Sequence, residues 1–282
     1  MSFVLTLSCP DRPGIVANVG GFLASHQFNI RELAQFSDPE TGLFFMRIAF
    51  DAVAGNHAVE DVRAEFEPVA APFGMTWAIH DQRIKPRLLI MVSRFGHCLN
   101  DLLYRYSIGA LPVEIVAIVS NHRDMADRAD DAGIPYELMP VTPETKAAQE
   151  ARLSALIEHE RVDLVVLARY MQVLSPALCA ALSGRIINIH HSFLPSFKGA
   201  RPYHQAHARG VKLIGATAHY ITDAIDEGPI IDQEAARIDH AMTPDDLAAV
   251  GRDIESVVLA RAITYHLQRR VFLNGNKTVV FR

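Results

Sequence analysis

The first 81 residues alternate between the spacing of strands and the spacing of helices. Apolar runs of strand length stand at residues 3–8, 27–36, 43–50 and 75–80. Two other stretches, 15–23 and 59–69, place apolar residues three or four positions apart, as on one face of a helix. The order is strand, helix, strand, strand, helix, strand, which predicts a small ferredoxin-like βαββαβ domain over residues 1–81.

The rest of the chain repeats a strand-then-helix pattern. Strands are predicted at 88–92, 113–120, 164–167, 186–189 and 278–281. Helices are predicted from residue 99, at 123–132, at 143–159 and at 251–270. This alternation predicts an α/β domain with a doubly wound, mostly parallel sheet over residues 87–282. The charged, apolar-poor segment 82–86 is predicted as the linker between the two domains.

Composition narrows the classes of protein. With 282 residues and 50% hydrophobic content, the chain can bury one large and one small core. A net charge of -5 disfavours a nucleic-acid partner. Cys9, Cys98 and Cys179 are widely separated, which predicts free thiols in a reducing compartment. No apolar run is long enough to cross a membrane and no secretory signal begins the chain, so we expect a cytoplasmic location.

Polar side chains follow two apolar runs in the second half of the chain. Asn188 and His190 stand two apart on a predicted strand and therefore project to the same side. His219 and Asp226 follow the apolar segment 211–218, just before a turn at Gly-Pro. An amide and an imidazole can stabilise an oxyanion, and a carboxylate can activate water. The pattern predicts a site for attack of water on a carbonyl.

Each residue has a structural interpretation as well. Asn188 can bond the backbone at a strand end, His190 can be a buried structural histidine, and Asp226 can be a solvated turn acid. The combined pattern favours the site. Segment 192–202 has no helical period and is predicted as an irregular loop over it.

The runs NIHHSFLPSFKGARPYHQA and GATAHYITDAIDEGPII resemble the folate-dependent formyltransferase family over residues 86–282. Members hydrolyse 10-formyltetrahydrofolate or transfer its formyl group to an amine. The resemblance implies that Asn188, His190 and Asp226 are catalytic, that His219 supports them, and that folate is the substrate, with no further cofactor. It also implies two folate-binding loops, made of Met171, Gln172, Val173 and Leu174 and of Ile221, Thr222 and Asp223.

Three alternatives to a folate site apply to this half of the chain: core packing, a metal site and a dinucleotide site. The apolar members of the first loop, Met171, Val173 and Leu174, can instead pack in a core. A catalytic metal is disfavoured, because His204 and His207 stand three apart without an HExxH pattern or paired cysteines. A dinucleotide site is disfavoured too, since the junction after the strand at 88–92 has one glycine and no GxGxxG.

The stretch PDRPGIVANVGGFLASHQFNI resembles an ACT domain, a module that pairs with a second copy and binds amino acids. The resemblance implies an effector site made of Asp11, Arg12, Pro13, Gly14, Ile15 and Asn29. Methionine and glycine are the expected effectors, and a homo-oligomer is the expected assembly. A helix N-terminus exposes backbone N–H groups that suit an effector carboxylate. Dimerisation without a ligand is the alternative.

Three functions compete at this point. The first is hydrolysis of 10-formyltetrahydrofolate, supplying formate for purine synthesis, which the fusion of the two modules favours. The second is formyl transfer to an amine such as glycinamide ribonucleotide. The resemblance disfavours it, because Gly96, His97 and Cys98 stand where those transferases carry a Gly-Ser-Asn run that holds phosphate. The third is an amino-acid sensor, which the intact Asn188, His190 and Asp226 argue against.

Overall fold

The computed structural model describes residues 1–282 except 54, 56 and 196–201. Its contacts divide the chain into two compact units. The first contains Met1–Lys85 together with Tyr265–Asn274 and Thr278–Arg282, and the second contains Pro86–Thr264 with Gly275–Lys277. The predicted linker therefore lies at the division between the units.

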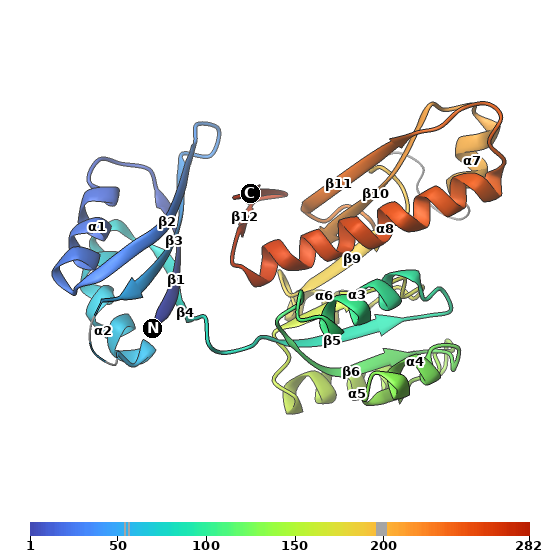
Figure 1. The fold of residues 1–282 in the computed structure, drawn as a ribbon, viewed down its shortest axis with the longest axis horizontal. Coiled ribbons are helices and arrows are strands. Elements are labelled where there is room, and N and C mark those ends of the chain that lie inside the picture. The colour runs from blue at the N-terminus through green and yellow to red at the C-terminus, as the bar shows by residue number, and fades with distance from the viewer. Residues whose placement is uncertain (54, 56, 196–201) are drawn as a thin grey trace. The chain divides into compact units, whose positions relative to one another are not determined.

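The first unit has a four-stranded sheet covered by two helices (Figure 1). Its strands are β1 (Ser2–Pro10), β2 (Phe28–Asp38), β3 (Leu43–Ala52) and β4 (Thr76–Asp81), in the order β2-β3-β1-β4. Its helices are α1 (Ile15–Ser25) and α2 (Val59–Ala70), and a short 3-10 turn, η1 (Ala71–Phe73), follows α2. All neighbouring strands are antiparallel. The predicted βαββαβ order is confirmed.

Strand β3 is buried on both of its faces. Met46 and Phe50 belong to the core that the helices cover. Phe45 and Arg47 point to the opposite face, because successive strand residues alternate, yet they are only 1% and 3% exposed. A segment from the end of the chain covers them: the rings of Phe45 and Phe272 lie 5.8 Å apart between centroids.

The covering segment contains the end of the last helix and a hairpin, β12 (Val271–Asn274) and β13 (Lys277–Val280). Polar contacts hold it to the first sheet. Arg47 Nε donates to the Gln268 carbonyl at 2.9 Å, and Arg47 and Arg270 both pair with Glu32. Residues 265–274 and 278–282 therefore group with the first unit, although the sequence pattern placed them in the second domain.

The second unit is built on a seven-stranded sheet in the order β11-β10-β9-β8-β5-β6-β7. The strands are β5 (Arg87–Val92), β6 (Glu114–Ser120), β7 (Tyr136–Leu138), β8 (Leu164–Leu167), β9 (Ile186–His190), β10 (Leu213–Tyr220) and β11 (Ile230–Arg237). Strands β5 to β9 are parallel, and β10 and β11 are antiparallel additions. The predicted mostly parallel sheet is confirmed, and β7 and β11 are strands that the apolar pattern did not indicate.

In the described part of the second unit, six helices accompany this sheet. They are α3 (His97–Ser107), α4 (Ala126–Asp131), α5 (Lys146–His159), α6 (Pro176–Ala181), α7 (Pro202–Ala208) and α8 (Pro244–Leu267). Helix α7 begins at the last residue of the irregular loop predicted over 192–202, and residues 196–201 of that loop lie outside the described residues. None of the helices in the described ranges is long and apolar enough to cross a membrane.

Candidate active site

The site lies where the strand order reverses. From β5 the chain moves outward through β6 and β7, and then returns to β8 on the other side of β5. Loops after the carboxyl ends of such strands diverge and leave a crevice between them. The loops after β5, β8 and β9 and the loop after β10 line one cavity of about 620 Å³.

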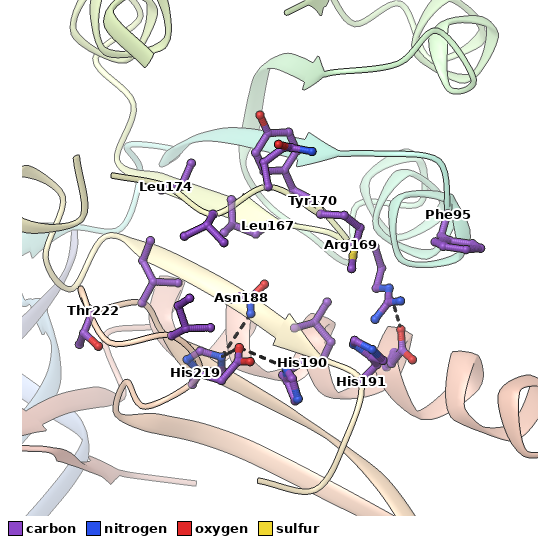
Figure 2. Close-up of a pocket in the computed structure, with 18 of the residues that line it drawn as sticks. Phe95, Leu167, Arg169, Tyr170, Leu174, Asn188, His190, His191, His219 and Thr222 are labelled. Carbon is purple, nitrogen blue, oxygen red and sulfur yellow. Dashed lines mark hydrogen bonds and ion pairs between the residues drawn. The ribbon is translucent and has the colours of Figure 1, made fainter. Parts of the chain in front are cut away.

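Asn188 and His219 are brought together by strand register. β9 and β10 are antiparallel neighbours, and Asn188 stands directly opposite His219. The Asn188 Nδ2 atom lies 3.2 Å from His219 Nε2 (Figure 2). Side chains directly opposite each other on neighbouring strands are within contact distance, so the sheet itself fixes this pair.

The contacts of His219 define its protonation. Its Nδ1 lies 2.8 Å from the Tyr220 carbonyl oxygen, which can only accept a hydrogen bond, so Nδ1 carries the proton. Burial lowers the pKa of His219, although the Tyr220 carbonyl and Asp226 oppose the shift. The ring is therefore neutral, and Nε2 accepts a hydrogen bond from the Asn188 amide. This bond sets which way the amide points.

His190 and Asp226 form the second pair of the site. His190 Nδ1 lies 3.1 Å from Asp226 Oδ1, and His190 is only 5% exposed. The hydrogen bond from His190 lowers the pKa of Asp226 despite its partial burial, so the carboxylate is ionised. An ionised carboxylate only accepts, hence His190 Nδ1 carries a proton. The other ring nitrogen, Nε2, is buried without a hydrogen-bond partner among the described residues.

The predicted catalytic residues thus converge. Asp226 Oδ1 also lies 3.9 Å from His219 Nε2, which is longer than a hydrogen bond. His219 therefore orients Asn188 through a hydrogen bond, whereas Asp226 is oriented by His190.

A tight turn places Asp226. Its φ of 57° lies in the left-handed region, which non-glycine residues seldom adopt. Two residues later, Gly228 packs directly against the backbone of Tyr220, where a Cβ would stand 1.7 Å from the carbonyl oxygen. The Tyr220 N–H donates to the Pro229 carbonyl at 2.9 Å. Gly228 is therefore the residue that lets the Asp226 loop close onto β10.

All the predicted folate-binding residues line the same cavity. They are Met171, Gln172, Val173, Leu174, Ile221, Thr222 and Asp223. Leu174 is buried, whereas Met171 and Val173 are 52% and 56% exposed. Core packing therefore accounts for Leu174 only. The first loop is anchored to the end of β5, because the Met171 N–H donates to Ser93 Oγ at 2.9 Å.

The predicted effector residues do not all meet within one chain. Asp11 follows Pro10, which pairs with Leu43 at one end of the sheet. Asn29 pairs with Asp51, and Asp51 pairs with Ser2 at the other end. Eight residues of extended strand separate the ends by about 26 Å. Gly14 has a φ of 98° and α1 has no side-chain cap at its start, whereas Ile15 is buried in the core.

A second polar group lines the cavity and was not predicted as a site. Glu255 on α8 is 1% exposed. It accepts a hydrogen bond from Tyr203 Oη at 2.6 Å and lies 2.8 Å from His97 Nε2 and 3.4 Å from Arg169 Nε. We call these four residues the Glu255 cluster. The sequence carried one signal: Glu255 interrupts an apolar stripe, between Gly251 and Val258 on the buried face of α8.

Within the described residues, one set of side chains could hold a metal ion: His97, Cys98 and Glu255, whose ligand atoms lie within 4.8 Å of one another. Burial raises the pKa of the Cys98 thiol. Thiolate is the form that binds metal, so this set is poorly suited to it. The histidines at 204 and 207, considered from the sequence, do not form such a set in the described part of the chain.

Comparison with known proteins agrees with the two-module arrangement. Residues 86–263 match the formyl transferase family model, and residues 3–67 match the ACT domain model. Formyltetrahydrofolate deformylase from Corynebacterium sp. (strain P-1) is 50% identical over 279 residues, which are 99% of this chain and 98% of that one.

Two solved structures place the fold. The crystal structure of formyltetrahydrofolate deformylase from Burkholderia mallei has a TM-score of 0.95 at 55% identity and covers 100% of this chain and 99% of that chain. Glycinamide ribonucleotide transformylase 1 from Symbiobacterium toebii has a TM-score of 0.66 at 30% identity, covering 70% of this chain and 95% of that chain. The match to the transformylase therefore does not extend over the remaining part of this chain.

Proposed function

Because the chain belongs to the formyltetrahydrofolate deformylase family, we propose that it hydrolyses 10-formyltetrahydrofolate to formate and tetrahydrofolate. The observation that carries the proposal is the convergence of Asn188, His190 and Asp226, from β9 and the loop after β10, on one cavity. The formate would supply purine synthesis, and the reaction would balance the folate pools.

The reaction needs a base, an oxyanion partner and a proton donor. In the proposed sequence, the Asp226 carboxylate takes a proton from water as the water oxygen adds to the formyl carbon. The Asn188 amide keeps one N–H beyond the one donated to His219. This N–H stabilises the oxyanion together with the Nε2–H of a protonated His190 imidazole, whose Nδ1–H stays on Asp226. When the bond between the formyl carbon and N10 breaks, N10 receives the proton, which gives tetrahydrofolate and formate.

Formate release without any acceptor tests the hydrolase directly. The purified protein is incubated with 10-formyltetrahydrofolate alone and then with glycinamide ribonucleotide. We expect formate at the same rate in both incubations. Consumption of the formyl donor only when the amine is present would establish the transferase instead. An Asp226→Ala variant that releases formate as fast as the unaltered protein would contradict the assigned role.

The proposal requires no metal ion or cofactor. A carboxylate, an amide and an imidazole supply the base and the oxyanion partners that hydrolysis of a formyl group needs. We expect formate release to survive dialysis against a chelator. The three cysteines are free, as predicted, and they are also buried; free thiols support a reducing, cytoplasmic location.

The ACT unit supports regulation by amino acids. The uncapped start of α1, next to Gly14, offers backbone N–H groups to a carboxylate. Strand β2 is an edge strand and leaves Ile30, Leu33 and Phe36 exposed. Pairing β2 antiparallel with β2 of a second copy would bring Asn29 of that copy to the end of the sheet that carries Gly14. We therefore propose a homo-oligomer whose effector sites form between copies.

Methionine and glycine are the proposed effectors, and calorimetry with each amino acid tests them. We expect binding by at least one, together with a change in the rate of formate release. The Gly14→Pro variant should abolish that binding, because proline has no backbone N–H and cannot adopt the left-handed φ at the start of α1. A monomer in light scattering, or no heat with either amino acid, would contradict this part of the proposal.

A further inference from the structure

The structure leaves open why water, rather than an amine, takes the formyl group. The transformylase from Symbiobacterium toebii shares the fold of the second unit, so the fold does not decide between the two. The decision must come from side chains beside the catalytic residues. The Glu255 cluster is the group there that the hydrolytic steps do not use.

Arg169 of the Glu255 cluster lies on the side of Asn188 opposite to Leu174 and Thr222, which belong to the two folate loops (Figure 2). Figure 2 shows Leu174 and Thr222 on one side of Asn188, and His191 and Phe95 on the other. With folate held by its loops on the first side, a nucleophile other than folate reaches the formyl carbon from the second side. An amine acceptor would therefore occupy the second side.

A chain of contacts connects the catalytic residues to the cluster. The rings of His190 and His191 lie 5.1 Å apart, and those of His191 and Tyr203 lie 6.4 Å apart. Tyr203 then donates to Glu255. All of these residues line one cavity, so the cluster and the catalytic residues face the same space.

We propose that Arg169, anchored by Glu255, fills the side of the cavity from which an amine would approach, and thereby makes the site hydrolytic. This inference rests on the proposed deformylase function. Arg169 follows β8 directly and its side chain is only 10% exposed. Its guanidinium lies 5.7 Å from the Phe95 ring centroid, and both residues line the cavity.

The backbone of Arg169 shows that its position is imposed. Its φ of 65° is left-handed, a conformation that suits glycine far better than arginine. Strained residues persist where the surroundings over-determine them, and they cluster at functional sites. Here the Arg169 carbonyl accepts from the Ser93 N–H at 3.2 Å, and Ser93 Oγ accepts from the Met171 N–H. The loop is therefore held at the strained residue and again two residues after it.

The hydrogen-bonding character of the cluster also disfavours an amine. An arginine has donors and no acceptor, and Arg169 Nε and Nη1 have no hydrogen-bond partner in the described part of the chain. Both oxygens of Glu255 already contact other groups. Oε1 accepts a hydrogen bond from Tyr203, and Oε2 lies close to His97 and Arg169. The N–H groups of an amine that entered this space would find both oxygens of Glu255 already in contact with other groups.

The electrostatics of the cluster keep this arrangement fixed. Burial alone would raise the pKa of Glu255, but the bond from His97 and the charge of Arg169 lower it overall. Burial and the charge of Arg169 lower the pKa of His191 to about 4, so His191 adds no second positive charge near neutral pH. Arg169 and Glu255 therefore compensate each other as a buried pair.

Glycinamide, a small neutral amine, is the probe for the closed side. The unaltered protein and the Arg169→Gly variant receive 10-formyltetrahydrofolate with and without glycinamide, and mass spectrometry measures N-formylglycinamide and formate. Removing one member of a buried ion pair can destabilise the fold, so the double variant Arg169→Gly with Glu255→Gln is made as well. Arg161→Gly is the control, because Arg161 is also a left-handed arginine but is exposed and outside the cavity.

We expect the ratio of N-formylglycinamide to formate to rise at least tenfold in an Arg169→Gly background and to stay unchanged in Arg161→Gly. An unchanged ratio in a folded Arg169 variant that still releases formate would overturn the inference. So would loss of both products from the folded variants, since a residue that only closes the acceptor side is not needed for hydrolysis. If the unaltered protein releases no formate without an amine, the proposed function itself fails.

Discussion

Replacing Gly228 with alanine tests how closely the chemistry depends on the Asp226 loop. The added Cβ would stand 1.7 Å from the Tyr220 carbonyl oxygen and 2.8 Å from its carbonyl carbon. Carbon and oxygen atoms that are not bonded approach to about 3.3 Å, so the two backbones must separate by about 1.5 Å. Neither partner is a flexible side-chain end, because both segments are main chain.

The separation affects activity more than stability. It lengthens the bond from the Tyr220 N–H to the Pro229 carbonyl and shifts Asp226, two residues away, relative to His190. Misplacement by about 1 Å can cost 10²-fold in rate, so we expect kcat/KM for formate release to fall by about 10². Overpacking costs about 1–3 kcal/mol, which calorimetry or denaturant unfolding would show as a modest loss.

Gly21→Ala is the matched control for this prediction. A Cβ at Gly21 meets nothing within 4 Å, and Gly21 lies inside α1. Alanine in a helix interior is favoured over glycine by about 0.5–1 kcal/mol, so stability should rise slightly and formate release should not change. A Gly228→Ala protein whose kcat/KM stays within about threefold of the unaltered protein would refute the reasoning.

Asn188→Ala should lower kcat about 10² to 10³-fold with little change in KM, because an oxyanion donor acts in the transition state; an equal rise in KM would count against that role. Asp226→Asn should lower kcat about 10²-fold or more. The pKa of Asp226 lies below its usual value, so a pH–rate profile of the unaltered protein should show no loss of activity through this group between pH 8 and 5. Burial and the charge of Arg269 lower the pKa of His80 to about 4 and that of His266 to about 3. Both histidines are uncharged in the folded state, so the stability they contribute is present above the unfolded pKa, about 6.5, and is lost as the pH falls towards 4. Thermal unfolding should show the melting temperature decreasing from pH 7 to pH 5, and His80→Leu should reduce that decrease; a melting temperature independent of pH would contradict the burial of these groups.

The sequence indicated which side chains would share one side of a strand, because strand periodicity determines their direction. Asn188 and His190 had to share a side once residues 186–189 formed a strand. What the sequence did not show was the partner strand: β10 is antiparallel to β9 and puts His219 opposite Asn188. That register comes from tertiary packing, so the sequence did not show that His219 would hydrogen-bond Asn188.

The Glu255 cluster was harder to predict because its members come from four distant segments. His97 begins α3, Arg169 follows β8, Tyr203 lies on α7 and Glu255 on α8. Each residue alone looks like an ordinary surface residue in the sequence. The charged residue within the apolar stripe of α8 was the one local signal that a buried polar partner was needed.

The domain limit at the end of the chain was missed for a related reason. The apolar pattern of residues 251–281 predicts a helix and a strand, but it does not say which sheet they cover. The near-continuous apolar run of β3 was the signal available, because a sheet covered on one face only shows alternating polar residues. Phe45 and Arg47 occupy the face that the closing segment covers.

That arrangement has a consequence for synthesis. The residues that cover Phe45 leave the ribosome about 180 residues after the first sheet has been made. At roughly 5–20 residues per second, one face of the newly synthesised ACT sheet stays uncovered for roughly 10 to 40 s. Throughout that interval the nascent chain displays an aromatic surface to chaperones and to neighbouring polypeptides.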